Sequence, residues 1–111
     1  MPTVFVTQQP MRKDPLTQQW VPSMNMNESR HYGDIKILMP SQSHFLDPAD
    51  LVVQLKEALS QYDPEKDSLI PVGDPLITAT AIGILARAHG QFTLLRWDNR
   101  VKRYSPITII L

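Results

Sequence analysis

Cysteine is absent from this sequence of 111 residues. The chain therefore cannot form disulfides, use a thiolate nucleophile, or bind zinc or an iron–sulfur cluster through cysteine. Long apolar runs are absent too: the most apolar segment, residues 76–88, is interrupted by Thr78, Thr80 and Arg87 and is too short to cross a membrane. The chain does not open with a basic stretch followed by an apolar one, as a signal peptide would. These absences lead us to expect a cytoplasmic protein without a membrane partner.

Neither charge sign is in excess, since 11 Lys and Arg balance 11 Asp and Glu. A neutral chain has no overall field that would attract nucleic acid, so any such site must be local. The three histidines, His31, His44 and His89, lie too far apart in sequence to form a metal-binding pair. No paired carboxylates, no activated-serine motif and no glycine-rich nucleotide fingerprint are evident in the sequence. We therefore expect no catalytic residue, no bound metal and no cofactor.

Prolines, of which there are 10, divide the chain into short elements. From residue 34 onward the patterns read strand, helix, strand, helix, strand, strand, and strand–helix–strand units imply parallel pairing. The sequence thus predicts a single α/β domain over residues 1–111, with a mixed sheet of about five strands, two main helices and a C-terminal antiparallel hairpin. Residues 1–33 are expected to supply an N-terminal strand and an irregular segment beside a βαβαββ core of residues 34–111. The central strands are predicted at 35–39, 69–72 and 92–97.

Both predicted helices begin with the dipeptide Asp-Pro. Asp47 and Asp74 are suited to accept hydrogen bonds from the free N–H groups of the first turn, and a proline fits there because its missing N–H is not needed. Gly90 is expected to end the second helix. The stretch "VGDP" that precedes this helix therefore reads as a well-capped helix start.

The same stretch also lies where a ligand site would be, since ligands of open α/β sheets bind at the carboxyl ends of parallel strands. The loops at 41–45 and 73–78 follow two predicted strands and should meet there. Asp74 argues against a phosphate at this place, because it already supplies a negative charge to the helix start. The helix-cap interpretation is favoured, and the alternative is a site for a nucleotide or a sugar made of Ser41, Ser43, His44, Gly73, Asp74 and Thr78.

The second helix, over residues 75–89, is apolar around most of its circumference. A helix that packs on one face of a sheet needs an apolar stripe on one side only. We therefore expect a second cover, either the N-terminal segment or another copy of the protein. Gly83 costs about 1 kcal/mol in a helix interior relative to alanine, which suggests that something approaches closely at this position. These two features predict a homodimer mediated by this helix.

The C-terminal hairpin carries basic and aromatic residues in alternation. Such a surface could hold nucleic-acid phosphates while stacking bases, or could anchor a protein partner, and a charged hairpin tip could equally serve only solubility. The candidate contact residues are Arg96, Trp97, Arg100, Lys102, Arg103 and Tyr104.

Several segments spread over nearly the whole chain resemble small proteins encoded by tailed bacteriophages and prophages. They are "VFVTQQPMRKD", "WVPSMNMN", "YGDIKILMP", "DSLIPVGDP", "LLRWD" and "RY". The resemblance implies a phage-type protein made in the cytoplasm of a bacterial host, and it transfers no activity and no site residue.

Three functions follow from these observations. The leading hypothesis is a small non-enzymatic accessory protein that binds and modulates a host or phage protein as a homodimer. The first alternative is a protein that sequesters or slowly cleaves a nucleotide with the loops at 41–45 and 73–78. The second alternative is a nucleic-acid accessory protein that uses the basic hairpin of residues 96–103.

Overall fold

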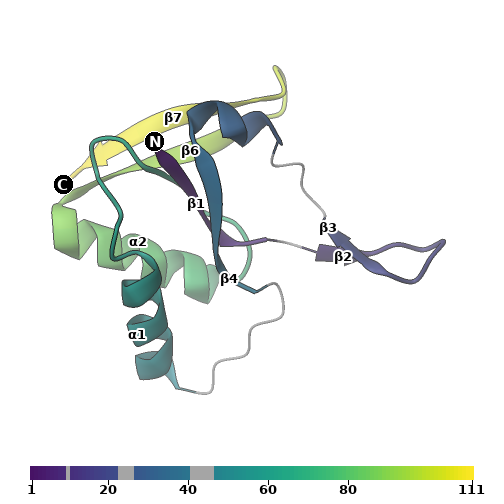
Figure 1. The fold of residues 1–111 in the computed structure, drawn as a ribbon, viewed down its shortest axis with the longest axis horizontal. Helices are drawn as coiled ribbons and strands as arrows, with labels where there is room; N and C mark the ends of the chain where they lie inside the picture. The colour runs from purple at the N-terminus through teal and green to yellow at the C-terminus, as the bar shows by residue number, and fades with distance from the viewer. Residues whose placement is uncertain (10, 23–26, 41–46) are drawn as a thin grey trace.

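A five-stranded mixed sheet forms the centre of the protein (Figure 1). The structure is a computed structural model, and it describes residues 1–9, 11–22, 27–40 and 47–111. Three neighbouring pairs of strands run parallel, and the last pair is antiparallel. The predicted α/β fold with a C-terminal hairpin is confirmed. In spatial order the strands are β4 (Asp34–Met39), β1 (Thr3–Gln8), β5 (Ser68–Ile70), β6 (Gln91–Asp98) and β7 (Arg103–Ile110).

The N-terminal strand β1 lies inside the sheet, between β4 and β5. Val4, Phe5, Val6 and Thr7 are all buried, as expected for a parallel strand that is covered on both faces. The prediction that residues 35–39 form a central strand is therefore wrong, because β4 is an edge strand. The sequence pattern identified both strands, but their order in the sheet depends on which faces the connections cross.

Two helices cover one face of this sheet, namely α1 (Pro48–Ala58) and α2 (Pro75–His89). Both begin as predicted, because Asp47 accepts a hydrogen bond from the Ala49 N–H and Asp74 accepts one from the Leu76 N–H, each over 2.9 Å. Right-handed crossovers explain why the helices share a face, since β4 to β5 and β5 to β6 both move in the same direction across the sheet. Their apolar sides pack on Phe5, Leu69 and Phe92 to form the larger core.

The connection from β1 to β4 moves in the opposite direction and therefore crosses the other face. A 3-10 helix, η1 (Asn27–Tyr32), lies on that face and places Tyr32 against a smaller core around Val6 and Tyr104. The Tyr32 hydroxyl donates a hydrogen bond of 2.8 Å to the Tyr104 carbonyl. This part of the N-terminal segment is thus on the far side of the sheet from α2 and does not supply the second cover expected for that helix.

A separate two-stranded hairpin, β2 (Met11–Lys13) and β3 (Trp20–Pro22), precedes η1 and projects from the body of the protein (Figure 1). Asp14 begins its turn by accepting hydrogen bonds from the backbone of Leu16 and Gln18. No helix in the described part of the chain is long and apolar enough to cross a membrane.

Candidate functional site

The glycine turn between β5 and α2 is packed against the end of β1. Gly73 has a φ of +96°, and a Cβ added to it would lie 2.6 Å from both the Cβ and the Oε1 atom of Gln8. The next residue, Asp74, donates its backbone N–H to Gln8 Oε1 over 2.9 Å. Glycine is therefore needed at position 73 for its backbone conformation and for the close approach of Gln8.

Gln8 also binds the chain on its other side. Its Nε2 atom donates to the Pro40 carbonyl over 2.8 Å, and the side chain is only 6% exposed. The crevice between the carboxyl ends of β1 and β5 is where the strand order changes direction, and a doubly wound sheet would bind its ligand there. In this protein a glutamine side chain spans that crevice and links three strand ends.

The residues predicted at this sheet edge are partly brought together. Gly73, Asp74 and Thr78 lie around one turn, and their polar groups serve the turn itself: Thr78 donates its hydroxyl to the Val72 carbonyl at 3.4 Å, and Asp74 caps α2. Thr7 exchanges hydrogen bonds with the backbone of Val72 through its hydroxyl. Ser41, Ser43 and His44 lie outside the described residues. The contribution of Gln8 was missed, although a polar residue directly after the apolar strand "TVFVT" is a signal that could have found it.

The tip of the β6–β7 hairpin holds its charges in local contacts. Arg100 donates to Asp98 from its backbone N–H and from its side chain, with Nη2 3.3 Å from Oδ2, and these hydrogen bonds lower the pKa of Asp98. Lys102 donates from Nζ to Asn99 Oδ1 over 2.6 Å. Arg100 and Lys102, two of the candidate contact residues, are therefore engaged within the tip.

The aromatic and basic residues of this hairpin lie on different faces. Trp97 and Tyr104 are cross-strand partners whose rings meet edge to face at 5.0 Å, and Tyr104 belongs to the smaller core opposite the helices. Successive side chains of a strand point to opposite faces, so Arg96 and Arg103 lie on the helix side of the sheet. Adjacent letters in the sequence thus do not form one mixed stacking surface.

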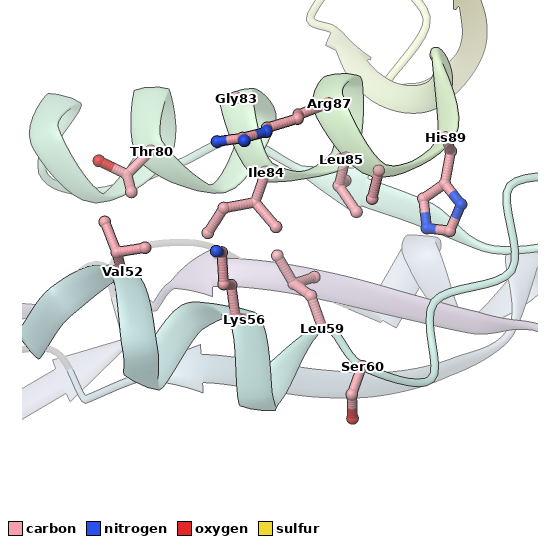
Figure 2. A pocket seen from close by; sticks show the side chains of 11 residues that line it. Val52, Lys56, Leu59, Ser60, Thr80, Gly83, Ile84, Leu85, Arg87 and His89 are labelled. Atoms are coloured by element: carbon pink, nitrogen blue, oxygen red, sulfur yellow. The ribbon is translucent and has the colours of Figure 1, made fainter. Parts of the chain in front are cut away.

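A hollow with apolar walls lies between α1 and α2 and has a volume of about 690 Å³. Val52 and Leu59 of α1 point toward Ile84 of α2 across this groove, as Figure 2 shows. We call it the interhelical groove. It is lined by Val52, Lys56, Leu59, Ser60, Thr80, Gly83, Ile84, Leu85, Arg87, Ala88 and His89.

All charge on the walls of the interhelical groove has one sign. Lys56 points from α1 toward α2, and the side chain of Arg87 runs along α2 (Figure 2). Neither forms an ion pair with any described residue. His89 stands at one end, with its ring 5.7 Å from that of Tyr62. No aspartate or glutamate is among the lining residues. The groove therefore offers an apolar floor with a cationic rim.

In the described part of the chain, one stripe of α2 is buried, namely Ile77, Ala81 and Leu85. Leu76 remains 52% exposed, and an added Cβ on Gly83 would meet nothing within 4 Å. The close approach expected at Gly83 is therefore not made by a described part of this chain.

A protein-family comparison places these features in a phage context. The family model described as "Phage Pam3 gp32-like protein" matches residues 2–111. No curated protein and no solved structure matches the chain. The match covers nearly the whole sequence and confirms the resemblance to phage-encoded proteins. The chain belongs to the family of Phage Pam3 gp32-like proteins.

Proposed function

We propose that this phage protein acts without catalysis, by binding another protein in the interhelical groove. The proposed setting is the cytoplasm of the infected bacterium, where the protein would work as a homodimer. The bound partner is a host or phage protein whose activity changes when one of its helices occupies the groove.

Gly83 carries this proposal. A glycine costs about 1 kcal/mol in the interior of a helix relative to alanine, yet α2 keeps one at its middle. Within the described residues nothing approaches the position where its side chain would be. The missing side chain leaves room beside Ile84 and Thr80 for a partner backbone to come close to α2. The distance between packed helices depends on the side chains at the contact, and small residues there let the backbones come close.

The lining of the groove limits the chemistry of the partner. Val52, Leu59 and Ile84 offer an apolar floor, which suits the apolar side of an amphipathic helix. Lys56 and Arg87 lie beside this floor without an acidic neighbour in the groove. A helix with acidic residues next to its apolar stripe would complement both features, because opposite charges at the rim speed association and select the partner.

The two alternatives have less support from the described residues. A nucleotide at the sheet edge would need the turn at Gly73. The Gln8 side chain already packs against Gly73 and accepts the hydrogen bond from the Asp74 N–H of this turn. Nucleic acid at the hairpin would need Arg100, which is bound to Asp98. Both stay predictions, and a thermal-shift screen with nucleotides and short single-stranded DNA tests them together. A salt-tolerant shift with a nucleotide would replace our proposal by the first alternative, and a salt-sensitive shift with DNA alone would replace it by the second.

The groove itself is tested by capture of proteins from a lysate of infected host cells on immobilised wild type, Gly83→Phe and Gln54→Phe. Phe at 83 adds a ring on the exposed side of α2 beside the groove, where an added Cβ meets nothing within 4 Å. Gln54 is exposed on α1 outside the groove and controls for an added surface aromatic. We expect a protein that binds to the wild type and to Gln54→Phe, is lost with Gly83→Phe, and is weakened by Lys56→Glu. Equal capture by Gly83→Phe and the wild type would contradict the proposal.

A further inference from the structure

We propose that two copies of this protein pair through the exposed edges of strand β7, antiparallel and centred on Thr108, so that both sheets join into one. This inference rests on the proposed function only in taking the protein to be a homodimer. It assigns the dimer contact to β7 and leaves the interhelical groove free for another protein.

The hydrogen-bond register identifies which backbone groups of β7 face outward. The Leu111 N–H donates to the Gly90 carbonyl over 2.9 Å, and the register of the hairpin places these two residues opposite each other. Directly opposed residues of an antiparallel pair alternate between hydrogen-bonded and non-hydrogen-bonded pairs. The N–H and C=O groups that point away from β6 therefore belong to Tyr104, Pro106, Thr108 and Ile110.

Two contacts agree with this assignment. The outward carbonyl of Tyr104 accepts the hydrogen bond from the Tyr32 hydroxyl, so η1 covers this end of the edge. Pro106 has no N–H, and at an outward position its absence costs no hydrogen bond to β6. The open part of the edge thus begins at Pro106 and offers the outward donors of Thr108 and Ile110.

A two-fold axis at Thr108 satisfies all of these donors. Thr108 would exchange both of its backbone hydrogen bonds with Thr108 of the second copy, and the Ile110 N–H would donate to the Pro106 carbonyl opposite. Because Pro106 lacks an N–H, a shifted register between the two copies of β7 would leave either the Pro106 carbonyl or an outward N–H group without a hydrogen bond. The same arrangement sets Ile107 beside Ile109 of the second copy, next to the larger core against which Ile109 already packs.

Apart from Pro106, the side chains of this edge lack the usual protection against pairing. Residues 104–111 contain no charged side chain, and Ile110 is 75% exposed. The opposite edge, β4, carries Asp34 and Lys36, and charged residues of this kind are what keep a free edge from pairing. The difference between the two edges favours β7 as the edge that meets a second copy, in the symmetric contact typical of homodimers.

The test compares the molar mass of the wild type with those of Thr108→Pro and Thr108→Val over a range of concentrations, by light scattering or sedimentation. Proline at 108 removes an outward N–H and leaves the bonds to β6 intact. Valine keeps the N–H and loses only the hydroxyl contact with Thr93, which both variants lose. We expect a dimer for the wild type and Thr108→Val, and association weaker by about tenfold or more for Thr108→Pro. A cooperative thermal unfolding transition in each variant shows that both are folded.

A second experiment reports on the symmetry axis. Thr108→Lys and Thr108→Glu should each be monomeric, because two like charges would meet at the axis, and their mixture should form a heterodimer. A mixture that stays monomeric, or a Thr108→Pro variant that dimerises like Thr108→Val, would overturn the β7 contact while leaving the homodimer in place. A monomeric wild type would overturn both the contact and the homodimer, whereas the capture experiment with Gly83→Phe tests the groove independently.

Discussion

The side chain of Gln8 accepts a hydrogen bond from the backbone N–H of Asp74, and it thereby joins the end of β1 to the start of α2 across 66 residues of sequence. The same side chain donates to the Pro40 carbonyl at the end of β4. Because β1 lies between β4 and β5, one glutamine fixes the ends of three adjacent strands. At the sheet edge where doubly wound sheets bind ligands, this side chain holds strand ends together.

Replacement of Gln8 by leucine should therefore destabilise the fold. The variant loses the hydrogen bond that Gln8 accepts from the Asp74 N–H and the one that it donates to the Pro40 carbonyl. Each lost hydrogen bond costs about 1 kcal/mol, so we expect the free energy of unfolding to fall by about 2 kcal/mol. Urea denaturation measures this change, and Gln54→Leu on the exposed side of α1 is the control. A loss no larger than that of the control would contradict the bridging role.

Two glycines of the same region should respond to alanine in opposite directions. Gly73→Ala would place a methyl group 2.6 Å from Gln8 at a φ of +96°, so we expect a loss of about 2 kcal/mol or more. Gly83→Ala meets no neighbour within 4 Å in an ordinary helical turn, so we expect a gain of up to about 1 kcal/mol. Thermal or urea unfolding of the two variants in parallel measures both changes. A destabilised Gly83→Ala monomer would show that the glycine serves the fold and not a partner.

Some features of this fold are predictable from the sequence and others are not. The Asp-Pro pairs at 47 and 74 predict both helix starts because capping is a local matter of a few bonds. The place of β1 in the sheet was not predictable in the same way, since it depends on η1 and the two helices crossing opposite faces. The apolar circumference of α2 predicted a second cover by the N-terminal segment or by another copy, and the described part of that segment lies on the other face of the sheet. The structure shows that α1 supplies one wall beside α2 and leaves a groove.

Ionisation of Tyr62 should lower the stability of the protein at alkaline pH. Burial raises the pKa of Tyr62 above its ordinary value of 10.0, with the nearby Asp67 and Asp63 adding to the effect against the hydrogen bond from Thr93. A raised pKa means that the folded state holds the proton more tightly, so the contribution is complete below pH 10 and is lost as the pH rises through the raised pKa.

Tyr62→Phe tests this dependence. The variant loses the hydrogen bond to the Asp67 carbonyl and the one from the Thr93 N–H, both of 3.2 Å, and should be less stable at neutral pH by about 1 to 2 kcal/mol. Its free energy of unfolding should then fall less steeply than that of the wild type above pH 10. Parallel slopes for the two proteins would show that Tyr62 does not cause the alkaline loss.

The contact between Asp98 and Arg100 should be visible in the titration of a single carboxyl group. Hydrogen bonds from the side chain and backbone of Arg100 lower the pKa of Asp98 below its ordinary value of 3.8, so their stabilising effect is present above that pH and is lost as the pH falls through the lowered pKa. Arg100→Ala should raise the pKa of Asp98, but not fully, because the backbone N–H of residue 100 still donates to Oδ1. Nuclear magnetic resonance of the Asp98 carboxyl carbon during acid titration measures this shift.

Lys102→Ala is the control, because it removes an equal charge from the same tip. Lys102 binds Asn99 and not Asp98, so this variant should move the pKa of Asp98 less. Equal shifts in both variants would mean that the general positive charge of the tip, and not the bond to Arg100, sets the titration of Asp98.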